Sequence, residues 1–186
     1  MARMATESGV TTAEALIRLP GGRWRYELVD GVLRQMTPAG HVHGKIAARI
    51  CARLTAFVEE QNLGHAYAAE TGFLLRRSPD TVRAPDAAFV SAARLEALAL
   101  SARGYFPGSP DLAIEVLSPD DAAGAVEAKT ADWLTSGCVV IIIDPVLAIA
   151  TVHRPGASVV TLRGRDELTV PDLLPGWAVT VGELFR

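Results

Sequence analysis

One segment constrains the fold more than any other, because it contains two apolar runs separated by a helical pattern. Residues 111–117 and 138–144 predict strands, and a helix between them begins at Ser118-Pro119-Asp120-Asp121 and ends before Gly137. A serine cap, a proline at the first helical position, acidic residues in the first turn and a final glycine are typical helix boundaries. The length suits one parallel crossover unit, so the sequence predicts an α/β fold.

Acidic residues interrupt two of the predicted strands. Alternation along residues 111–117 places Glu115 in the middle of an otherwise apolar strand, and Asp86 stands between Pro85 and the apolar residues 87–90. A carboxylate buried in a sheet needs a cation or several hydrogen-bond donors. Two such carboxylates on neighbouring strands would form an oxygen-ligand site suited to Mg²⁺.

A lysine follows on the helix of the same crossover unit. Lys129 lies three residues after Val126 and four before Trp133, so it shares their packed face and points back toward the strand of Glu115. The chain has 18 basic residues, of which only Lys45 and Lys129 are lysines. An ammonium can be tuned in a way that guanidinium cannot, although codon bias also explains so few lysines.

The residues before this unit predict a short helix, a hairpin and a long helix. Thr11 and Glu14 form a capping-box pattern for a short helix that Pro20 and Gly21 end. Residues 24–29 and 32–36 alternate around Asp30-Gly31, which predicts a hairpin. Residues 41–62 have helical spacing, and His43 falls on their inward stripe.

Further strands are expected on both sides of the crossover unit. Residues 66–76 and 82–91 predict two strands joined by Ser78-Pro79-Asp80, and residues 92–102 predict a short helix. Residues 148–154 and 158–163 predict a second hairpin, after which residues 173–185 close the fold over Trp177. No repeat or low-complexity tract appears. We therefore expect a frayed leader over residues 1–10 and a single domain over residues 11–186.

Composition limits the class of protein. The chain has 186 residues, 49% of them hydrophobic and 21% charged, as expected of a compact soluble domain. Its two cysteines, Cys51 and Cys138, are too few for a disulfide framework and favour a reducing, cytoplasmic location. No apolar run is long enough to span a membrane. A formal net charge of −3 excludes a general nucleic-acid coat but allows a local basic groove.

The residues named above also match a known pattern. Pro85-Asp86 and Glu115 resemble the PD-(D/E)XK nuclease core, and the chain more specifically resembles the Uma-two family of restriction-endonuclease-like proteins. The resemblance covers residues 11 to the end, and its most specific part is residues 110–119. The matching segments are residues 26–31, His43, Pro85-Asp86, residues 110–119, Lys129, Gly137, Asp144-Pro145 and residues 174–176.

The resemblance implies a mixed sheet flanked by helices, with the N-terminal hairpin as an addition. It also implies metal-dependent phosphodiester hydrolysis with Mg²⁺, for which Mn²⁺ can substitute. Asp86 and Glu115 would bind the metal, the Val116 carbonyl would add a ligand, and Lys129 would orient or activate the attacking water. The standard pattern places its lysine at the position of Leu117, so in this family the lysine has moved to the helix.

Two further residues match family positions near the same site. Glu27 and His43 would supply an additional metal contact or a proton relay. The alternative for Glu27 is a cross-strand ion pair with Arg34, which lies opposite it in the hairpin. The alternative for His43 is a structural histidine that is hydrogen-bonded near a helix start.

Other charged residues also have two interpretations. Asp111 shares the face of Glu115 but is expected to be a strand-entry residue. Lys129 on its own would be a lysine with its stem packed and its ammonium in water. Arg76, Arg77 and Arg83 flank the Asp86 strand and either contact phosphates or block a solvated strand edge.

The sequence therefore favours a Mg²⁺-dependent endonuclease that acts on DNA, in which dimerisation would concentrate arginines along one groove. Two alternatives stay open. The same cluster is a structural remnant in a non-catalytic module that binds nucleic acid or protein, or it hydrolyses a small phosphodiester. The acidic net charge favours these alternatives slightly, because DNA binding without sequence preference needs several cationic contacts.

Overall fold

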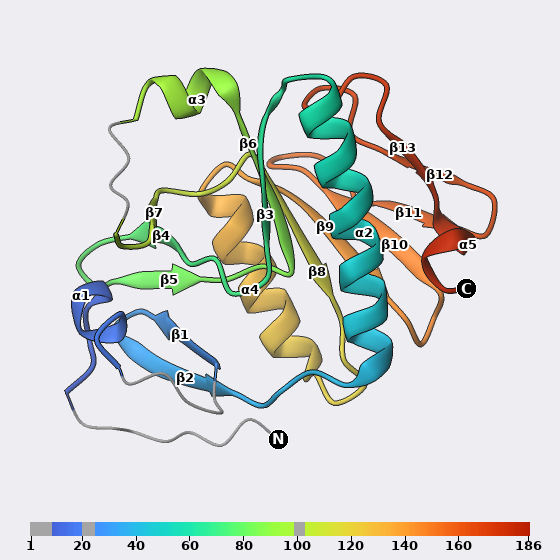
Figure 1. Ribbon diagram of the computed structural model, residues 1–186. Coiled ribbons are helices and arrows are strands. Elements are labelled where there is room, and N and C mark those ends of the chain that lie inside the picture. The colour runs from blue at the N-terminus through green and yellow to red at the C-terminus, as the bar shows by residue number, and fades with distance from the viewer. Residues whose placement is uncertain (1–8, 20–24, 99–102) are drawn as a thin grey trace.

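A computed structural model describes residues 9–19, 25–98 and 103–186 of the chain. Its elements are arranged as two larger sheets, a two-stranded sheet and five helices among these residues (Figure 1). The helices are α1 (Ala13–Leu16), α2 (His41–Glu60), α3 (Ala92–Glu96), α4 (Ala123–Thr135) and α5 (Val181–Leu184). The strands are β1 (Arg25–Val29), β2 (Val32–Met36), β3 (Gly64–Ala68), β4 (Phe73–Arg76), β5 (Thr81–Arg83), β6 (Ala87–Ser91), β7 (Phe106–Pro107), β8 (Leu112–Val116), β9 (Val139–Asp144), β10 (Ile149–His153), β11 (Val160–Arg163), β12 (Glu167–Thr169) and β13 (Ala178–Thr180).

The six-stranded sheet has the order β11-β10-β9-β8-β6-β3 and carries the predicted crossover unit at its centre. Strands β8 and β9 run parallel with Glu115 beside Ile142, and α4 connects them. Strand β6 runs antiparallel to β8. Prolines, glycines and β-branched runs in the sequence set these boundaries, and the predicted mixed sheet is confirmed.

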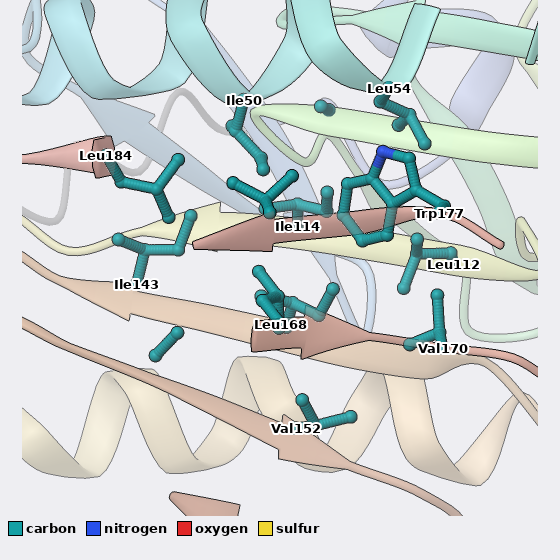
Figure 2. Packing of buried hydrophobic residues seen from close by; sticks show 14 of the residues in the cluster. Ile50, Leu54, Leu112, Ile114, Ile143, Val152, Leu168, Val170, Trp177 and Leu184 are labelled. Carbon is teal, nitrogen blue, oxygen red and sulfur yellow. The ribbon is translucent and has the colours of Figure 1, made fainter. Parts of the chain in front are cut away.

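Helices α2 and α4 cover opposite faces of this sheet (Figure 1). Four apolar side chains of α2 recur at a spacing of four residues and are buried against one face: Ile46, Ile50, Leu54 and Val58. Leu112 and Ile114 of β8 meet them there, together with Trp177 and α5 (Figure 2). The predicted helix over residues 41–62 and the closure over Trp177 are confirmed.

The five-stranded sheet has the order β2-β1-β5-β4-β7 and includes the predicted N-terminal hairpin. Asp30 and Gly31 both have positive φ, which is the conformation that a two-residue turn of this type requires. Leu28 of β1 lies opposite Val82 of β5, so the hairpin extends the sheet through an apolar contact. The hairpin is therefore an addition that pairs with β5 through β1.

Two predicted strands are wrong as single elements. Residues 66–76 contain β3 and β4, and residues 82–91 contain β5 and β6, each pair divided between the two larger sheets. In the second case Pro85 interrupts the strand, because proline lacks an N–H and restricts the residue before it. Asp86 thus lies where the chain passes from one sheet into the other.

Two predicted helix starts are also wrong in position. Thr12, not Thr11, caps α1 by accepting the Ala15 N–H at 3.2 Å. Helix α4 begins at Ala123, because Ser118 and Asp121 form a separate turn in which the Ser118 N–H donates to the Asp121 carboxylate at 2.8 Å. The end of α4 is as predicted, with Gly137 at φ 84°.

The remaining expectations of the fold have different outcomes. The second hairpin is confirmed as β10 and β11. Helix α3 is shorter than expected, and residues 99–102 lie outside the described residues, as do residues 1–8 of the expected leader and residues 20–24. The single domain over residues 11–186 stays a prediction.

Both cysteines are free. Among the described helices, none is long and apolar enough to cross a membrane.

Candidate active site

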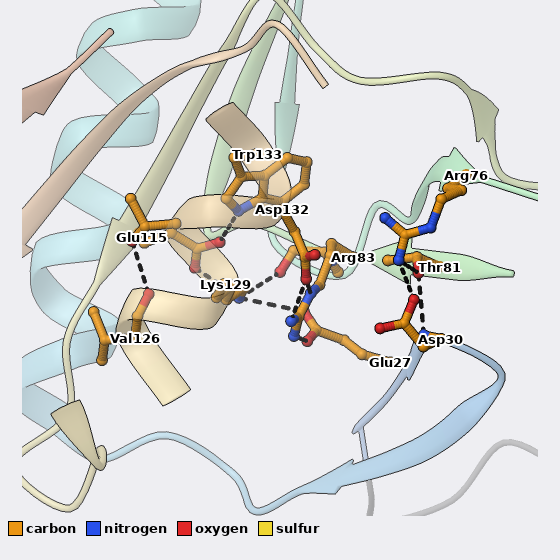
Figure 3. A network of polar contacts seen from close by, with 12 residues as sticks. Glu27, Asp30, Arg76, Thr81, Arg83, Glu115, Val126, Lys129, Asp132 and Trp133 are labelled. Carbon is orange, nitrogen blue, oxygen red and sulfur yellow. Dashed lines mark hydrogen bonds and ion pairs between the residues drawn. The ribbon is translucent and has the colours of Figure 1, made fainter. Parts of the chain in front are cut away.

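Glu115 is held by two donors from one helix. It lies in the centre of β8 on the face that α4 covers, and only 9% of it is exposed. Its Oε1 accepts the indole N–H of Trp133 at 2.9 Å, and its Oε2 accepts from the Lys129 ammonium at 2.8 Å (Figure 3). Lys129 and Trp133 are four residues apart on α4, so one helical turn presents both groups to the same carboxylate. The predicted approach of Lys129 to Glu115 is confirmed.

The Lys129 ammonium has two further oxygen neighbours. Glu27 Oε1 lies 3.2 Å from Nζ, and the Ala84 carbonyl accepts from it at 3.3 Å. These residues come from β1 and from the segment between β5 and β6, far from α4 in the sequence. The interpretation of Lys129 as an isolated surface lysine is therefore wrong.

Asp86 contacts the main chain on both sides of Glu115. Its N–H donates to the Ile114 carbonyl at 3.0 Å, and its Oδ2 accepts the Val116 N–H at 2.8 Å. Continuing the register of β6 and β8, in which Ala87 lies beside Ile114, places Asp86 beside Glu115. The structure thus brings the two predicted acids to one end of the same strand pair, with the Val116 main chain next to them.

His43 holds Asp86 from α2. Its Nε2 lies 3.1 Å from Asp86 Oδ2, and its side chain is 11% exposed. Its Nδ1 is buried and has no hydrogen-bond partner among the described residues. His43 therefore contacts one member of the site directly, a contact that fits both a site role and the alternative of a structural, hydrogen-bonded histidine near a helix start.

Glu27 is buried and bound from three sides. Its Oε1 accepts the Ala84 N–H at 3.0 Å and lies beside Lys129, while its Oε2 accepts from Arg83 Nη1 at 2.8 Å. Arg34 is opposite Glu27 in the hairpin, as the two-residue turn predicts. The expected alternative of a Glu27–Arg34 ion pair is nevertheless wrong, because the Glu27 side chain is directed toward Arg83 and Lys129.

Arg83, Asp132 and Trp133 complete the network and were not expected in it. Arg83 donates to Asp132 Oδ2 through Nε at 2.9 Å and through Nη2 at 2.6 Å (Figure 3). A guanidinium can thereby satisfy Glu27 and Asp132 together. The only sequence signal for Asp132 and Trp133 was their spacing of three and four residues from Lys129.

Burial and mutual repulsion raise the pKa of Glu115 to about 7. Burial is the largest cause, Lys129 opposes it, and the charges of Asp86 and Glu27 add to it. For Lys129, burial acts against the charged form, but Glu115 and Glu27 outweigh it and raise the pKa. Glu115 is therefore the carboxylate of the site whose charged form is disfavoured, mainly by burial.

The two carboxylates beside Glu115 behave differently from it. Burial of Asp86 is outweighed by the hydrogen bonds from His43 and Val116, so its pKa is lowered. Burial of Glu27 is outweighed by Lys129 and Arg83, so its pKa is also lowered. The hydrogen bond to Asp86 raises the pKa of His43 against the effect of burial. Asp86 and Glu27 are thus held as anions around Glu115.

The oxygen atoms of this site fit a hard divalent cation to which the protein supplies only a few of the ligands. Within residues 9–19, 25–98 and 103–186, no group of three or more His, Cys, Asp or Glu side chains is arranged to hold a metal ion. Mg²⁺ is usually held by one or two carboxylates, with waters and substrate phosphate in the other positions. Asp86, Glu115 and the Val116 carbonyl would supply oxygen ligands of that kind.

Of the other predicted candidates, Asp111, Arg76 and Arg77 lie outside this cluster and Arg83 lies within it. Asp111 accepts from the Ser91 N–H at 2.8 Å and from Arg94 at 3.0 Å, as a strand-entry residue should. Arg76 pairs with Asp30, and Arg77 pairs with Glu14 at 2.7 Å. Arg83 is buried in the network described above. The flanking arginines therefore make ion pairs within the chain.

A groove of about 1120 Å³ reaches the site from the side of α2. Small residues of α2 form part of its wall, and His43 and Asp86 lie in its lining together with Arg25, Tyr26 and Tyr105. Glu115 and Lys129 do not line it. A molecule entering this groove would therefore meet the His43–Asp86 pair first.

Comparison with known proteins identifies the fold and the family. A crystal structure described as "a putative nuclease belonging to DUF820 from Anabaena variabilis ATCC 29413" has a TM-score of 0.77 and 22% sequence identity, covering 94% of this chain and 97% of that one. This likeness confirms the fold. We found no match among curated proteins. The sequence profile of the Uma2 family, described as "Putative restriction endonuclease", matches residues 13–182, so the chain belongs to the Uma2 family.

Proposed function

We propose that this protein is a Mg²⁺-dependent endonuclease that hydrolyses phosphodiester bonds of DNA. The observation that carries the proposal is the meeting of Asp86 and Glu115 at one end of the β6–β8 pair, with Lys129 bonded to Glu115 at 2.8 Å. Membership of a family described as restriction endonucleases supports the reaction class. The formal net charge of −3 argues for a confined substrate contact rather than an extended one.

Each residue has a role that follows from its contacts. Asp86, Glu115 and the Val116 carbonyl would hold the cation, which supplies Lewis-acid stabilisation and a more acidic bound water. Lys129 carries a positive charge beside Glu115 and can offset charge that develops on the phosphate or orient the attacking water. Trp133 keeps Glu115 oriented through its indole N–H.

The residues around this core fix its charges in place. Glu27 and Arg83 hold the Lys129 side chain near the strand, because Glu27 is itself fixed by the Ala84 N–H and by Arg83. His43 holds Asp86 through Nε2 and would thereby keep this carboxylate oriented toward the metal. These contacts would give a preorganised site.

The test is cleavage of plasmid and single-stranded DNA by purified protein during titration with Mg²⁺ or Mn²⁺. We expect metal-dependent cleavage that disappears in Glu115→Ala. A matched control is Lys45→Ala, which changes the exposed lysine of α2 and should retain activity. If wild-type protein cleaves neither substrate at any metal concentration, or if Glu115→Ala cleaves as well as wild type, the proposal is wrong.

The same assay separates the two alternatives. Turnover of a model diester such as bis(4-nitrophenyl) phosphate without cleavage of DNA would indicate a small phosphodiester hydrolase. Calorimetry that detects no divalent ion would indicate a non-catalytic module, because a remnant site has no reason to retain metal affinity.

A further inference from the structure

The Lys129 ammonium occupies a position built from oxygen atoms. Glu115 Oε2, Glu27 Oε1 and the Ala84 carbonyl lie 2.8, 3.2 and 3.3 Å from its Nζ. Two carboxylates and a carbonyl are the ligand types that hard cations prefer. In this structure a cation tethered to α4 therefore neutralises the same carboxylate that the proposed function assigns to the metal.

The two donors that hold Glu115 differ in freedom. The Trp133 side chain is fully buried, and its ring lies 6.3 Å from that of Phe73 in an edge-on arrangement. The Lys129 side chain is 22% exposed and ends a flexible four-carbon stem. Glu115 Oε1 is thus held by a rigid donor and Oε2 by a mobile one.

The second carboxylate beside Lys129 stays in place without it. Glu27 accepts from Arg83 and from the Ala84 N–H, and Arg83 is fixed in turn by Asp132. An ammonium that leaves Glu115 therefore still has an anionic partner within reach of the same side chain. In this structure both carboxylates share Lys129, and Glu27 offers a partner for an arrangement in which Lys129 has left Glu115.

We propose that the Lys129 ammonium and the divalent cation compete for Glu115 Oε2, so that metal binding moves Lys129 toward Glu27 while Trp133 keeps its bond to Glu115. This inference rests on the proposed metal site. Lys129 then has two effects. Its ammonium weakens metal binding, and it becomes available to the phosphate only when the metal is bound. Binding of the metal and release of the Lys129 ammonium from Glu115 then occur together.

The experiment is calorimetric titration of Mn²⁺ into wild type, Lys129→Gln and the matched control Lys45→Gln, each checked by circular dichroism. Lys129→Gln should bind Mn²⁺ about tenfold or more tightly than wild type, because one competing charge is removed. Lys45→Gln should bind as wild type does. Cleavage of DNA should fall in Lys129→Gln in spite of the higher affinity.

Equal or weaker Mn²⁺ binding by Lys129→Gln would overturn the competition while leaving the proposed function intact. Absence of Mn²⁺ binding in wild type and variant alike would overturn both. Because Lys129→Gln leaves the buried Glu115 carboxylate without its cation, the variant could fail to fold. Recovery of its fold by Mn²⁺ would then support the competition directly.

A measurement on the wild-type protein does not depend on any variant's folding. The chain has only two lysines, so lysine labelled with ¹³C at Cε gives two side-chain signals, and Lys45→Gln identifies them. Saturating Mg²⁺ should shift the Lys129 signal and leave the Lys45 signal unchanged. A Lys129 signal that is unaffected by bound Mg²⁺ would overturn the proposal.

Discussion

The two faces of β8 use the same strand for opposite purposes. Leu112, Ile114 and Val116 point toward α2 and join a continuous apolar core. On the other face, Ala113 packs against the apolar part of α4, but Glu115 enters a network of buried charges. Alternation along one strand therefore separates the residues of the apolar core from the carboxylate of the proposed site.

The difference has an energetic meaning. Burying apolar side chains of the α2 face lowers the free energy of the folded state. Burying Glu115, Lys129 and Glu27 requires their desolvation, which their mutual attraction offsets only in part. The charged cluster on the α4 face is therefore not expected to stabilise the fold as the apolar face does. Changes on the two faces should consequently have different effects, which four substitutions or titrations can measure.

The largest effect is expected from Glu115→Gln on activity. The amide keeps the shape of the side chain but removes the charge that would hold the metal, so cleavage of DNA should fall by about 10³-fold or more. The free energy of unfolding should stay the same or increase, because one buried charge is removed. Cleavage rates and urea denaturation of the same preparations measure both quantities. Loss of activity together with unfolding would contradict the separation of the two faces.

The matched change on the α2 face is Ile114→Ala. Ile114 is fully buried against α2, so the substitution should lower the free energy of unfolding by about 2–5 kcal/mol. Metal affinity, measured by calorimetry well below the melting temperature, should change little. If Ile114→Ala retains full stability but loses metal binding, the assignment of roles to the two faces is wrong.

Trp133→Phe tests the boundary between the two roles, since Trp133 belongs to the apolar cluster and also donates to Glu115. Phenylalanine keeps most of the packing and removes the hydrogen bond to a charged group, which is worth about 1.5–3 kcal/mol. Mn²⁺ affinity should decrease, opposite in sign to the effect of Lys129→Gln. Trp133→Phe with unchanged Mn²⁺ affinity would show that Trp133 has only a packing role.

The most gradual effect is a pH dependence of stability in the absence of metal. The pKa of Glu115 is about 7 in the folded protein against an ordinary value of 4.5, so between these values the folded state keeps a proton that the unfolded chain has lost. Stability should therefore fall as pH rises through this range, by at most about 1.4 kcal/mol per pH unit for one proton.

The difference between wild type and Glu115→Gln isolates this contribution, because His43 and the other titrating groups are common to both proteins. Urea denaturation at a series of pH values between 4.5 and 8 measures it. Parallel stability curves for the two proteins would show that Glu115 does not retain a proton in the folded state.

The sequence predicted the parts of the site that depend on local periodicity. Alternation in residues 111–117 predicts that Glu115 and Ile114 lie on opposite faces of the strand. The spacing of Val126, Lys129 and Trp133 predicts that the Lys129 side chain points toward that strand. Both are consequences of regular strand and helix geometry, which a single sequence contains.

The missing parts depend on contacts between distant segments. The pairing of Glu27 with Arg83 requires the hairpin to join β5, and nothing in the hairpin's own register indicates it. The chain breaks at Pro85, which places Asp86 directly before the start of β6. The sequence nevertheless predicts one strand over residues 82–91, because the apolar pattern continues through Pro85. Trp133 appeared to be a packing residue, since periodicity cannot show what an indole N–H contacts.

The central claim, that Asp86 and Glu115 together hold a divalent cation, is tested most directly by a crystal structure determined after soaking with Mn²⁺. We expect an anomalous difference peak in contact with carboxylate oxygens of both residues, with the Trp133–Glu115 hydrogen bond preserved. Mn²⁺ bound elsewhere on an ordered chain, with no peak between these two acids, would contradict the claim.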